Sequence, residues 1–248
     1  MYDSDSEDDF FNLLDLVDEF TRRNQQGNNR YYDLEEIEAI ADYFFDTGKL
    51  KKALQVLDLG LQQHPGAESL ELKKVNFLTA LNRTREADRI LNRLEDQSLN
   101  YYELHLARAG LYSKIGKHYL AVQQYRKAIP YAEFPEDVYH LLALEYQVIG
   151  SLDQAIKYLK LSLKHLPDDE IALYNLALCY DLADENEAAR EFFKSFVDEN
   201  PYSEVGWYQL GILEAKLENH DEAIQALEYA TLIDEFFSAA YYERARLL

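Results

Sequence analysis

The sequence has almost no cysteine, no long apolar run and few basic residues, and each shortage excludes a class of protein. Its single cysteine, Cys179, excludes an intramolecular disulfide and any metal site built from several cysteines. No stretch comes near the ~20 consecutive apolar residues of a membrane-spanning helix. The N-terminal segment has acids where a secretion signal needs bases, and Asp15 and Asp18 interrupt its apolar residues. We therefore expect a cytoplasmic protein that does not enter a membrane.

Basic residues are outnumbered, with 25 Lys and Arg against 46 Asp and Glu and a net charge of −21. Residues 1–33 carry 9 acids and 3 bases, residues 34–135 carry 14 of each, and residues 136–248 carry 23 acids and 8 bases. Because an acidic surface repels phosphate backbones, we expect no nucleic-acid binding. The excess of acid favours an apolar or mildly basic protein partner, although solubility alone would also explain it.

Motifs that carry chemistry are missing as well. The sequence contains no P-loop, no GxGxxG, no HExxH, no GxSxG and no Cys/His cluster. Its six histidines never stand three or four residues apart, so no two of them share a helix face as metal ligands do. Cys179 falls at a place where a small buried core residue is expected. We predict no catalytic residue, no metal and no cofactor, and therefore a protein that is not an enzyme.

What the sequence does contain is one pattern repeated every 34 residues. Repeats begin at six evenly spaced residues: Leu34, Glu68, Tyr102, Glu136, Glu170 and Glu204. The twentieth place of every repeat is alanine: Ala53, Ala87, Ala121, Ala155, Ala189 and Ala223. The twenty-fourth place is always bulky: Leu57, Leu91, Tyr125, Leu159, Phe193 and Leu227. A period of this length indicates a solenoid of stacked helix pairs.

The residue types explain how such a pair packs. Small residues at the eighth and twentieth places allow two helices to approach closely, and bulky residues at the eleventh and twenty-fourth places fill the space beside that contact. The eleventh place is apolar or aromatic until the sixth repeat, where it is Glu214. Gly48, Gly116 and Gly150 fall where the first helix of a repeat should stop. One pair cannot bury its own apolar face, so neighbouring pairs stack, and the fold is expected to be all-α.

This pattern resembles the tetratricopeptide repeat (TPR) family, W-x2-L-G-x2-Y followed by Ala, Phe and Pro. The sixth repeat carries the opening as Trp207-Tyr208-Gln209-Leu210-Gly211, and Pro65, Pro167 and Pro201 stand at the thirty-second place, where the family's second helix ends. The resemblance covers the chain from Leu34 onward. It implies a right-handed α-solenoid of antiparallel helix pairs, with about six full repeats over 34–248 and one extra helix at each end. It also implies a protein-interaction scaffold.

Both ends depart from the full repeat. Residues 1–9 are an acidic run that we expect to be disordered, and residues 10–33 are expected to form an amphipathic helix and a polar loop. That helix either caps the first repeat or folds back into the groove as a docking segment. A partial seventh repeat starts at residue 238 and ends on Leu247-Leu248. We expect from this apolar ending that the chain is a piece of a longer array.

In the TPR family a partner lies in a groove lined by the first helix of each repeat, mainly at its second, fifth, ninth, twelfth and thirteenth places. Carried to this sequence, the fifth and ninth places predict a partner-binding set: Asn76, Leu106, His140, Leu144, Tyr174, Leu178, Tyr208 and Ile212. Family members that clamp a C-terminal carboxylate have Lys at the fifth place and Asn at the ninth. Only Asn76 remains of that pattern, and Glu38 and Asp42 have the wrong sign. The prediction is a protein or peptide partner held mainly by apolar contacts.

Other interpretations stay open at this point. The apolar groove residues could instead pack inward, if the superhelix is tighter than assumed. The chain could be a self-associating module, a homodimer joined through the ends of the array, or the TPR part of a longer multidomain protein. Inside the array, polar residues at normally apolar places suggest a Glu71–Arg108 pair between repeats. Pro130 and Pro135 predict an early end to the second helix of the third repeat.

Overall fold

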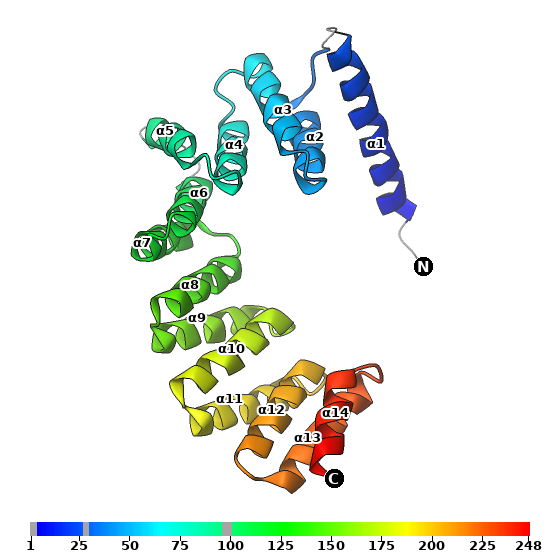
Figure 1. The fold of residues 1–248 in the computed structure, drawn as a ribbon, viewed down its shortest axis with the longest axis vertical. Coiled ribbons are helices and arrows are strands. Elements are labelled where there is room, and N and C mark those ends of the chain that lie inside the picture. Colours follow the sequence, from blue (N-terminus) through cyan, green and yellow to red (C-terminus); the bar gives the residue numbers. More distant parts are fainter. Residues whose placement is uncertain (1–3, 27–29, 96–100) are drawn as a thin grey trace. The chain divides into compact units, whose positions relative to one another are not determined.

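The computed structural model describes residues 4–26, 30–95 and 101–248. Within these residues the structure consists of fourteen α-helices, one short 3-10 helix and no strand. The chain folds into two compact units, Met1–Gln124 and Tyr125–Leu248. Each unit is a series of helices in which consecutive members pack side by side (Figure 1). The prediction of an all-α helical repeat solenoid is confirmed.

The helices follow the 34-residue period. The first unit holds α1 (Ser4–Gln25), α2 (Leu34–Asp46), α3 (Leu50–Gln63), α4 (Glu68–Ala80), α5 (Thr84–Leu94) and α6 (Tyr101–Lys114). Helix α7 (His118–Ala128) crosses the division between the units. The second unit holds α8 (Pro135–Ile149), α9 (Leu152–His165), α10 (Glu170–Ala183), α11 (Asn186–Glu199), α12 (Glu204–Lys216), α13 (His220–Ile233) and α14 (Ser238–Leu247). The first helix of each repeat begins within one residue of the start that the sequence pattern predicts.

The core of both units is built from the repeating places. All six alanines of the twentieth place are at least 97% buried, and so are all the bulky residues of the twenty-fourth place except Tyr125, which is 5% exposed. Glycine takes the eighth place only in the sixth repeat, as Gly211, and it is buried. Close helix contact through small residues, with large side chains beside it, is therefore the packing rule of this chain.

The first helix of every full repeat is followed by one residue in the left-handed conformation. These residues stand 34 apart: Gly48, Asn82, Gly116, Gly150, Asp184 and Glu218, with φ of 72°, 58°, 74°, 82°, 56° and 63°. The three glycines were predicted as helix stops, and this is confirmed. Three repeats use a residue with a side chain at the same place, which costs energy because Cβ crowds the backbone there.

Replacing Glu218 with glycine is expected to stabilise the protein by about 1 kcal/mol, because the exposed Glu218 occupies φ 63° without the freedom of glycine. Asp184→Gly should give a smaller gain, since Asp tolerates the left-handed region better than Glu. The midpoint of thermal unfolding followed by circular dichroism measures both. Gly150→Ala is the matched control and should destabilise; a loss of stability in Glu218→Gly would contradict the prediction.

The N-terminal helix begins earlier than predicted. The structure places residues 4–9 inside α1, whereas disorder was expected for residues 1–9; residues 1–3 lie outside the described part of the chain. Four of the six residues from 4 to 9 are acidic, and negative charge is favourable near the N-terminus of a helix. The polar loop was expected at residues 24–29; of these, residues 24 and 25 belong to α1, and residues 27–29 lie outside the described part.

Helix α1 packs on α2 through its apolar side. Val17 and Phe20 are each 4% exposed and join the core of the first unit. The Phe20 ring lies 5.6 Å from that of Tyr32 and 6.3 Å from that of Phe44, centroid to centroid. Helix α1 thus contributes side chains to the same core as α2.

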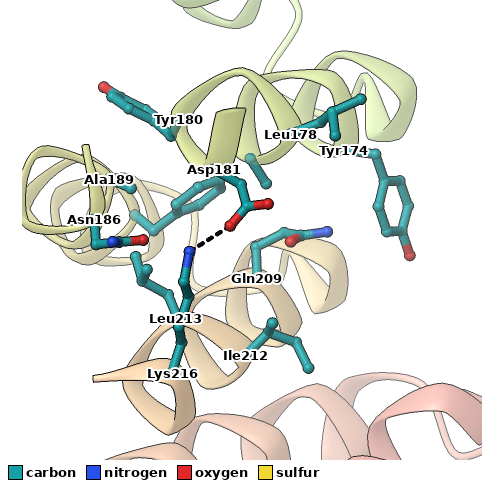
Figure 2. A pocket seen from close by; sticks show the side chains of 12 residues that line it. Tyr174, Leu178, Tyr180, Asp181, Asn186, Ala189, Gln209, Ile212, Leu213 and Lys216 are labelled. Carbon is teal, nitrogen blue, oxygen red and sulfur yellow. Dashed lines mark hydrogen bonds and ion pairs between the residues drawn. The ribbon is translucent and has the colours of Figure 1, made fainter. Parts of the chain in front are cut away.

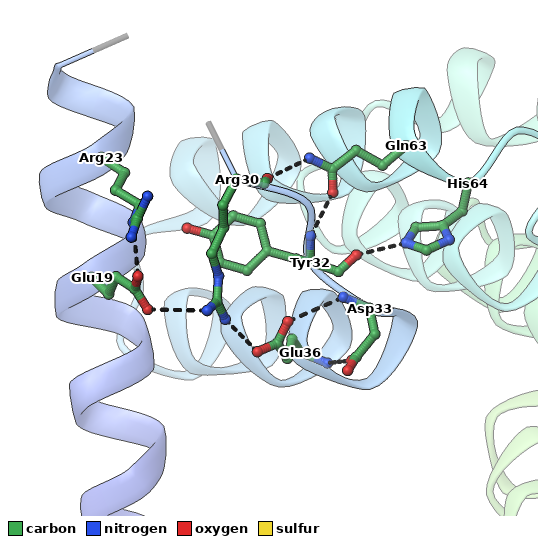
Figure 3. Close-up of polar contacts among 8 residues, drawn as sticks. All are labelled: Glu19, Arg23, Arg30, Tyr32, Asp33, Glu36, Gln63 and His64. Carbon is green, nitrogen blue, oxygen red and sulfur yellow. Dashed lines mark hydrogen bonds and ion pairs between the residues drawn. The ribbon is translucent and has the colours of Figure 1, made fainter. Parts of the chain in front are cut away.

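The segment before α2 holds these helices together (Figure 3). Tyr32 N–H donates to Gln63 Oε1 at 3.0 Å, Gln63 Nε2 donates to Arg30 O at 2.8 Å, and His64 Nε2 lies 2.7 Å from Tyr32 O. The Arg30 guanidinium stacks on the Tyr32 ring at 4.6 Å and pairs with Glu19 of α1 at 3.4 Å. The segment therefore connects α1 with the end of α3.

Two details inside the array can be compared with the structure. The Glu71–Arg108 pair is wrong, because both side chains find partners in or next to α5: Arg93 lies 3.0 Å from Glu71, and Arg108 lies 3.2 Å from Glu95. The charged groups that lie near Glu71 and Arg108 are thus Arg93, near the end of α5, and Glu95, the residue just after it. The early helix end is confirmed, since α7 stops at Ala128 and the 3-10 helix Ile129–Tyr131 follows.

Candidate interaction surface

Helix α10 carries a stripe of exposed apolar side chains. Ile171, Tyr174, Leu178 and Leu182 are 65%, 41%, 49% and 62% exposed. Their spacings of three, four and four residues place them on one face of the helix, because an α-helix turns once every 3.6 residues. The opposite face of α10 is buried, with Leu173, Leu176 and Tyr180 at 2% exposure or less. We call the four exposed residues the apolar stripe.

A cavity of about 300 Å³ opens beside this stripe, between α10, α11 and α12. Figure 2 shows that Tyr174 and Leu178 reach it from α10 and Ile212 from α12. Buried Tyr180, Phe193 and Leu213 line its inner wall: their exposed fractions are 9% or less. Across it, Asp181 of α10 and Lys216 of α12 form an ion pair. We call this space the Leu178 cavity.

The two predicted tyrosines lie next to each other. The ring centroids of Tyr174 and Tyr208 are 6.4 Å apart, and the Tyr208 ring also packs against Phe237 at 5.0 Å. Burial raises the pKa of both hydroxyls, so both stay neutral at physiological pH. Four predicted site residues, Tyr174, Leu178, Tyr208 and Ile212, are therefore brought together by the structure. They form an apolar surface with two neutral hydroxyl groups.

Two further spaces contain predicted residues. His140 lines a cavity of about 350 Å³ between α8, α9 and the start of α10, together with Glu136, Asp169 and Ile171. We call this the Glu136 cavity. Asn76 lines a cavity of about 480 Å³ in the first unit, where its neighbours include Glu38 and Asp42. Leu106 is half-buried on α6, and Leu144 is 36% exposed on α8.

Proteins of known structure share this architecture. The crystal structure of a tetratricopeptide repeat protein from Parabacteroides merdae superimposes with a TM-score of 0.57 at 15% identity, covering 96% of this chain and 93% of that chain. YrrB, described as a TPR protein with an unusual peptide-binding site, superimposes with a TM-score of 0.51 at 16% identity, covering 77% of this chain and 98% of that chain. Both likenesses concern the fold, and the 34-residue pattern agrees with them. The chain has the fold of a tetratricopeptide repeat protein.

Sequence comparison adds two matches. A family model described as anaphase-promoting complex, cyclosome, subunit 3 matches residues 148–230 of this chain. The human protein O-mannosyl-transferase TMTC3 is 24% identical over 170 residues, which is 67% of this chain. The matched region spans only 19% of that human protein.

The carboxylate clamp of other TPR proteins has no counterpart around Asn76. Of the described residues that line that cavity, Lys73 is the one lysine and pairs with Asp42 at 2.6 Å, and the other ionisable residues are acids. A negatively charged carboxylate of a partner would meet repulsion there. The cavity around Asn76 therefore suits a positively charged group.

Three residues of the surface were missed by the prediction from sequence. Ile171 and Leu182 occupy the second and thirteenth places of the fifth repeat, which also face the groove in TPR proteins, so the repeat pattern could have found them. Glu136 is different, because it is the first residue of its repeat and only the structure shows it 9% exposed at a cavity wall. No sequence pattern distinguishes it from the other acids.

The single cysteine belongs to the core. Cys179 is fully buried, and burial raises the pKa of its thiol even though Gln147 Nε2 donates to its sulfur at 2.9 Å, as expected of a core cysteine. In the described residues no group of three His, Cys, Asp or Glu side chains is placed to hold a metal ion. No helix in that part of the chain is both long and apolar enough to cross a membrane.

Proposed function

We propose that this TPR protein is a non-enzymatic scaffold, acting in the cytoplasm, that holds a segment of a partner protein on the surface of α10 and α12. The apolar stripe is the observation that carries the proposal: four large apolar side chains in a row on one helix face, with a cavity beside them. Contiguous exposed apolar surface on a protein marks an interaction site. A TPR protein with a peptide-binding site, YrrB, shares the fold.

The proposed anchors are Tyr174, Leu178, Tyr208 and Ile212. A partner side chain that enters the Leu178 cavity removes apolar surface from water, which contributes roughly 1.5–3 kcal/mol for a Leu- or Phe-sized group. Three or four such anchors give micromolar affinity after the cost of ordering the segment. Leu144 of α8 and His140 extend the proposed surface toward the start of the second unit. Asn76 and Leu106 belong to the first unit and are not included in it.

Leu178→Glu is expected to abolish partner capture, because it places a charge in the middle of the apolar stripe. The matched control is Leu232→Glu, the same change on α13 at a leucine that is 73% exposed and lines none of the three cavities described above. Wild type and both variants are used as baits in native lysate, after circular dichroism shows equal helicity and melting. A partner retained by wild type and Leu232→Glu but reduced at least tenfold on Leu178→Glu supports the proposal.

Identical proteins on all three baits would contradict the proposed surface. Recovery of the bait alone would instead favour self-association through the end of the array. That second function has one observation behind it: Tyr241 and Tyr242 of α14 are 46% and 65% exposed, although Ala240 of the same helix is fully buried. Light scattering over a range of concentrations separates a homodimer from a monomeric scaffold.

A further inference from the structure

A buried carboxylate oxygen without a hydrogen-bond donor lies next to the apolar stripe. Glu136, on α8, is 9% exposed and lines the Glu136 cavity. Within the part of the chain that the structure describes, its Oε2 atom is buried and makes no hydrogen bond. The imidazole Nδ1 of His165 lies 4.0 Å from this oxygen, beyond hydrogen-bond distance. A buried carboxylate oxygen in this state is costly and gains much from a positively charged donor.

A second carboxylate lines the same cavity. Asp169 accepts a hydrogen bond from the backbone N–H of Ala172 at 3.0 Å through Oδ1, which fixes its side chain at the N-terminus of α10. Its other oxygen, Oδ2, lies 3.4 Å from Nδ1 of His140. That imidazole nitrogen is buried and makes no hydrogen bond with any described residue. The cavity is therefore lined by the unpaired Glu136 oxygen and by a second carboxylate whose side chain is held in place.

The Glu136 cavity and the apolar stripe are continuous. Ile171 belongs to both, because it lines the cavity and is the first residue of the stripe. A segment lying along Tyr174 and Leu178 would therefore pass the mouth of the cavity at the beginning of α10. The groups around that mouth favour a cation, since Asp137 adds a third carboxylate to the lining. Among the described residues that line the cavity there is neither lysine nor arginine.

We propose that the Glu136 cavity receives a lysine or arginine side chain of the segment whose apolar side chains lie on the stripe. The inference rests on the proposed function and deepens it, because it states the chemistry of the partner: one basic residue next to apolar ones. Both basic side chains are long and bury their carbon stems while the charged end makes hydrogen bonds. A metal ion is a poorer occupant, since the described residues offer no set of three suitable ligands.

The test uses a displayed library of random 12-residue peptides selected on the full wild-type chain. Selected peptides should share a Lys or Arg at a constant distance from apolar residues. Synthetic versions are then measured by fluorescence anisotropy at one salt concentration, with the basic residue present or replaced by norleucine. On wild type the replacement should weaken binding about tenfold, the effect of one hydrogen bond to a charged group. On Glu136→Gln it should change binding less than twofold.

Two control variants decide what a negative result means. Glu199→Gln makes the same change at an exposed acid of α11 and should behave as wild type. Leu178→Glu should lose the peptides altogether. If norleucine costs the same on wild type and Glu136→Gln while Leu178→Glu still loses binding, the basic subsite is wrong and the proposed function stands. If Leu178→Glu binds the peptides as tightly as wild type, the proposed function fails, and the subsite fails with it.

Discussion

Gly211→Val is expected to lower the free energy of unfolding by about 2–3 kcal/mol, because α12 and α13 touch at this glycine. A Cβ atom built on Gly211 would stand 2.7 Å from Cγ of Leu227 and 3.3 Å from the backbone oxygen of Ala223. Neither is a flexible side-chain end: Cγ is the branching carbon of a fully buried leucine, and the carbonyl belongs to a helix. Valine must therefore push the two helices apart.

The matched control is Gly110→Ala in α6. This glycine is also helical, but a Cβ on it would meet no atom of the described residues within 4 Å. Alanine there should stabilise the protein by about 1 kcal/mol, the difference in helix propensity between the two residues. Urea denaturation followed by circular dichroism measures both variants. Equal stability of Gly211→Val and wild type would show that the α12–α13 contact is looser than described.

Glu214→Ala is expected to destabilise the protein by about 2 kcal/mol at neutral pH, because a buried carboxylate holds three donors together. Its side chain is 1% exposed and accepts from Arg190 at 2.8 Å, Lys194 at 3.1 Å and Asn219 at 2.7 Å. Breaking a fully buried pair costs roughly 3–5 kcal/mol. The expected loss is smaller here, since Arg190 and Lys194 are 30% and 47% exposed and regain water when the carboxylate is gone.

The contribution of Glu214 should depend on pH in one direction. Burial opposes its ionisation, but hydrogen bonds from Arg190, Asn219 and Lys194 together outweigh burial, so its pKa lies below the usual value of 4.5. A carboxyl whose pKa is lower in the folded state stabilises above its unfolded pKa and loses that contribution as pH falls through the folded value. The difference in unfolding free energy between wild type and Glu214→Gln should therefore shrink as pH falls below 4.5.

Denaturant titrations of wild type, Glu214→Gln and the exposed control Glu199→Gln between pH 7 and pH 3 measure this effect. The control removes one carboxylate at an exposed site, so it corrects for the change in net charge. A difference between wild type and Glu214→Gln that stays constant or grows in acid would contradict the lowered pKa.

Much of this fold follows from local residue pattern. The alanines of the twentieth place and the large residues of the twenty-fourth recur every 34 residues, and each occupies the same buried environment. The glycines that end the first helices stand at the same place in their repeats, because the two helices of each pair are joined by the same left-handed turn. Small size, bulk and backbone freedom are properties of single residues. They can therefore be recognised in the sequence without knowing which residue packs against each of them.

The polar interactions could not be predicted from the residue pattern. Glu71 and Arg108 looked like partners, yet each pairs with a residue in or just after α5, because those residues stand nearer in space. Glu214 broke the pattern of the eleventh place, and only the structure shows that three donors from two neighbouring segments make burial tolerable. Such pairings depend on distances of a few ångströms between side chains far apart in the chain.

The candidate surface, too, could be predicted only in part from the sequence. Residue order was enough to predict the repeat and the helix pairs, because a fixed period places equivalent residues on equivalent faces. The resemblance to TPR proteins then pointed to Tyr174, Leu178, Tyr208 and Ile212 as candidates for partner binding. The packing of the helices was needed to show that Tyr174, Leu178 and Ile212 line one cavity, with the Tyr208 ring next to Tyr174. It was also needed to show that Asn76 lies among acids, and that one buried oxygen of Glu136 has no hydrogen-bond donor among the described residues. A cavity and an unsatisfied charge are defined by what surrounds a residue, and those surroundings exist only once one repeat is stacked on the next.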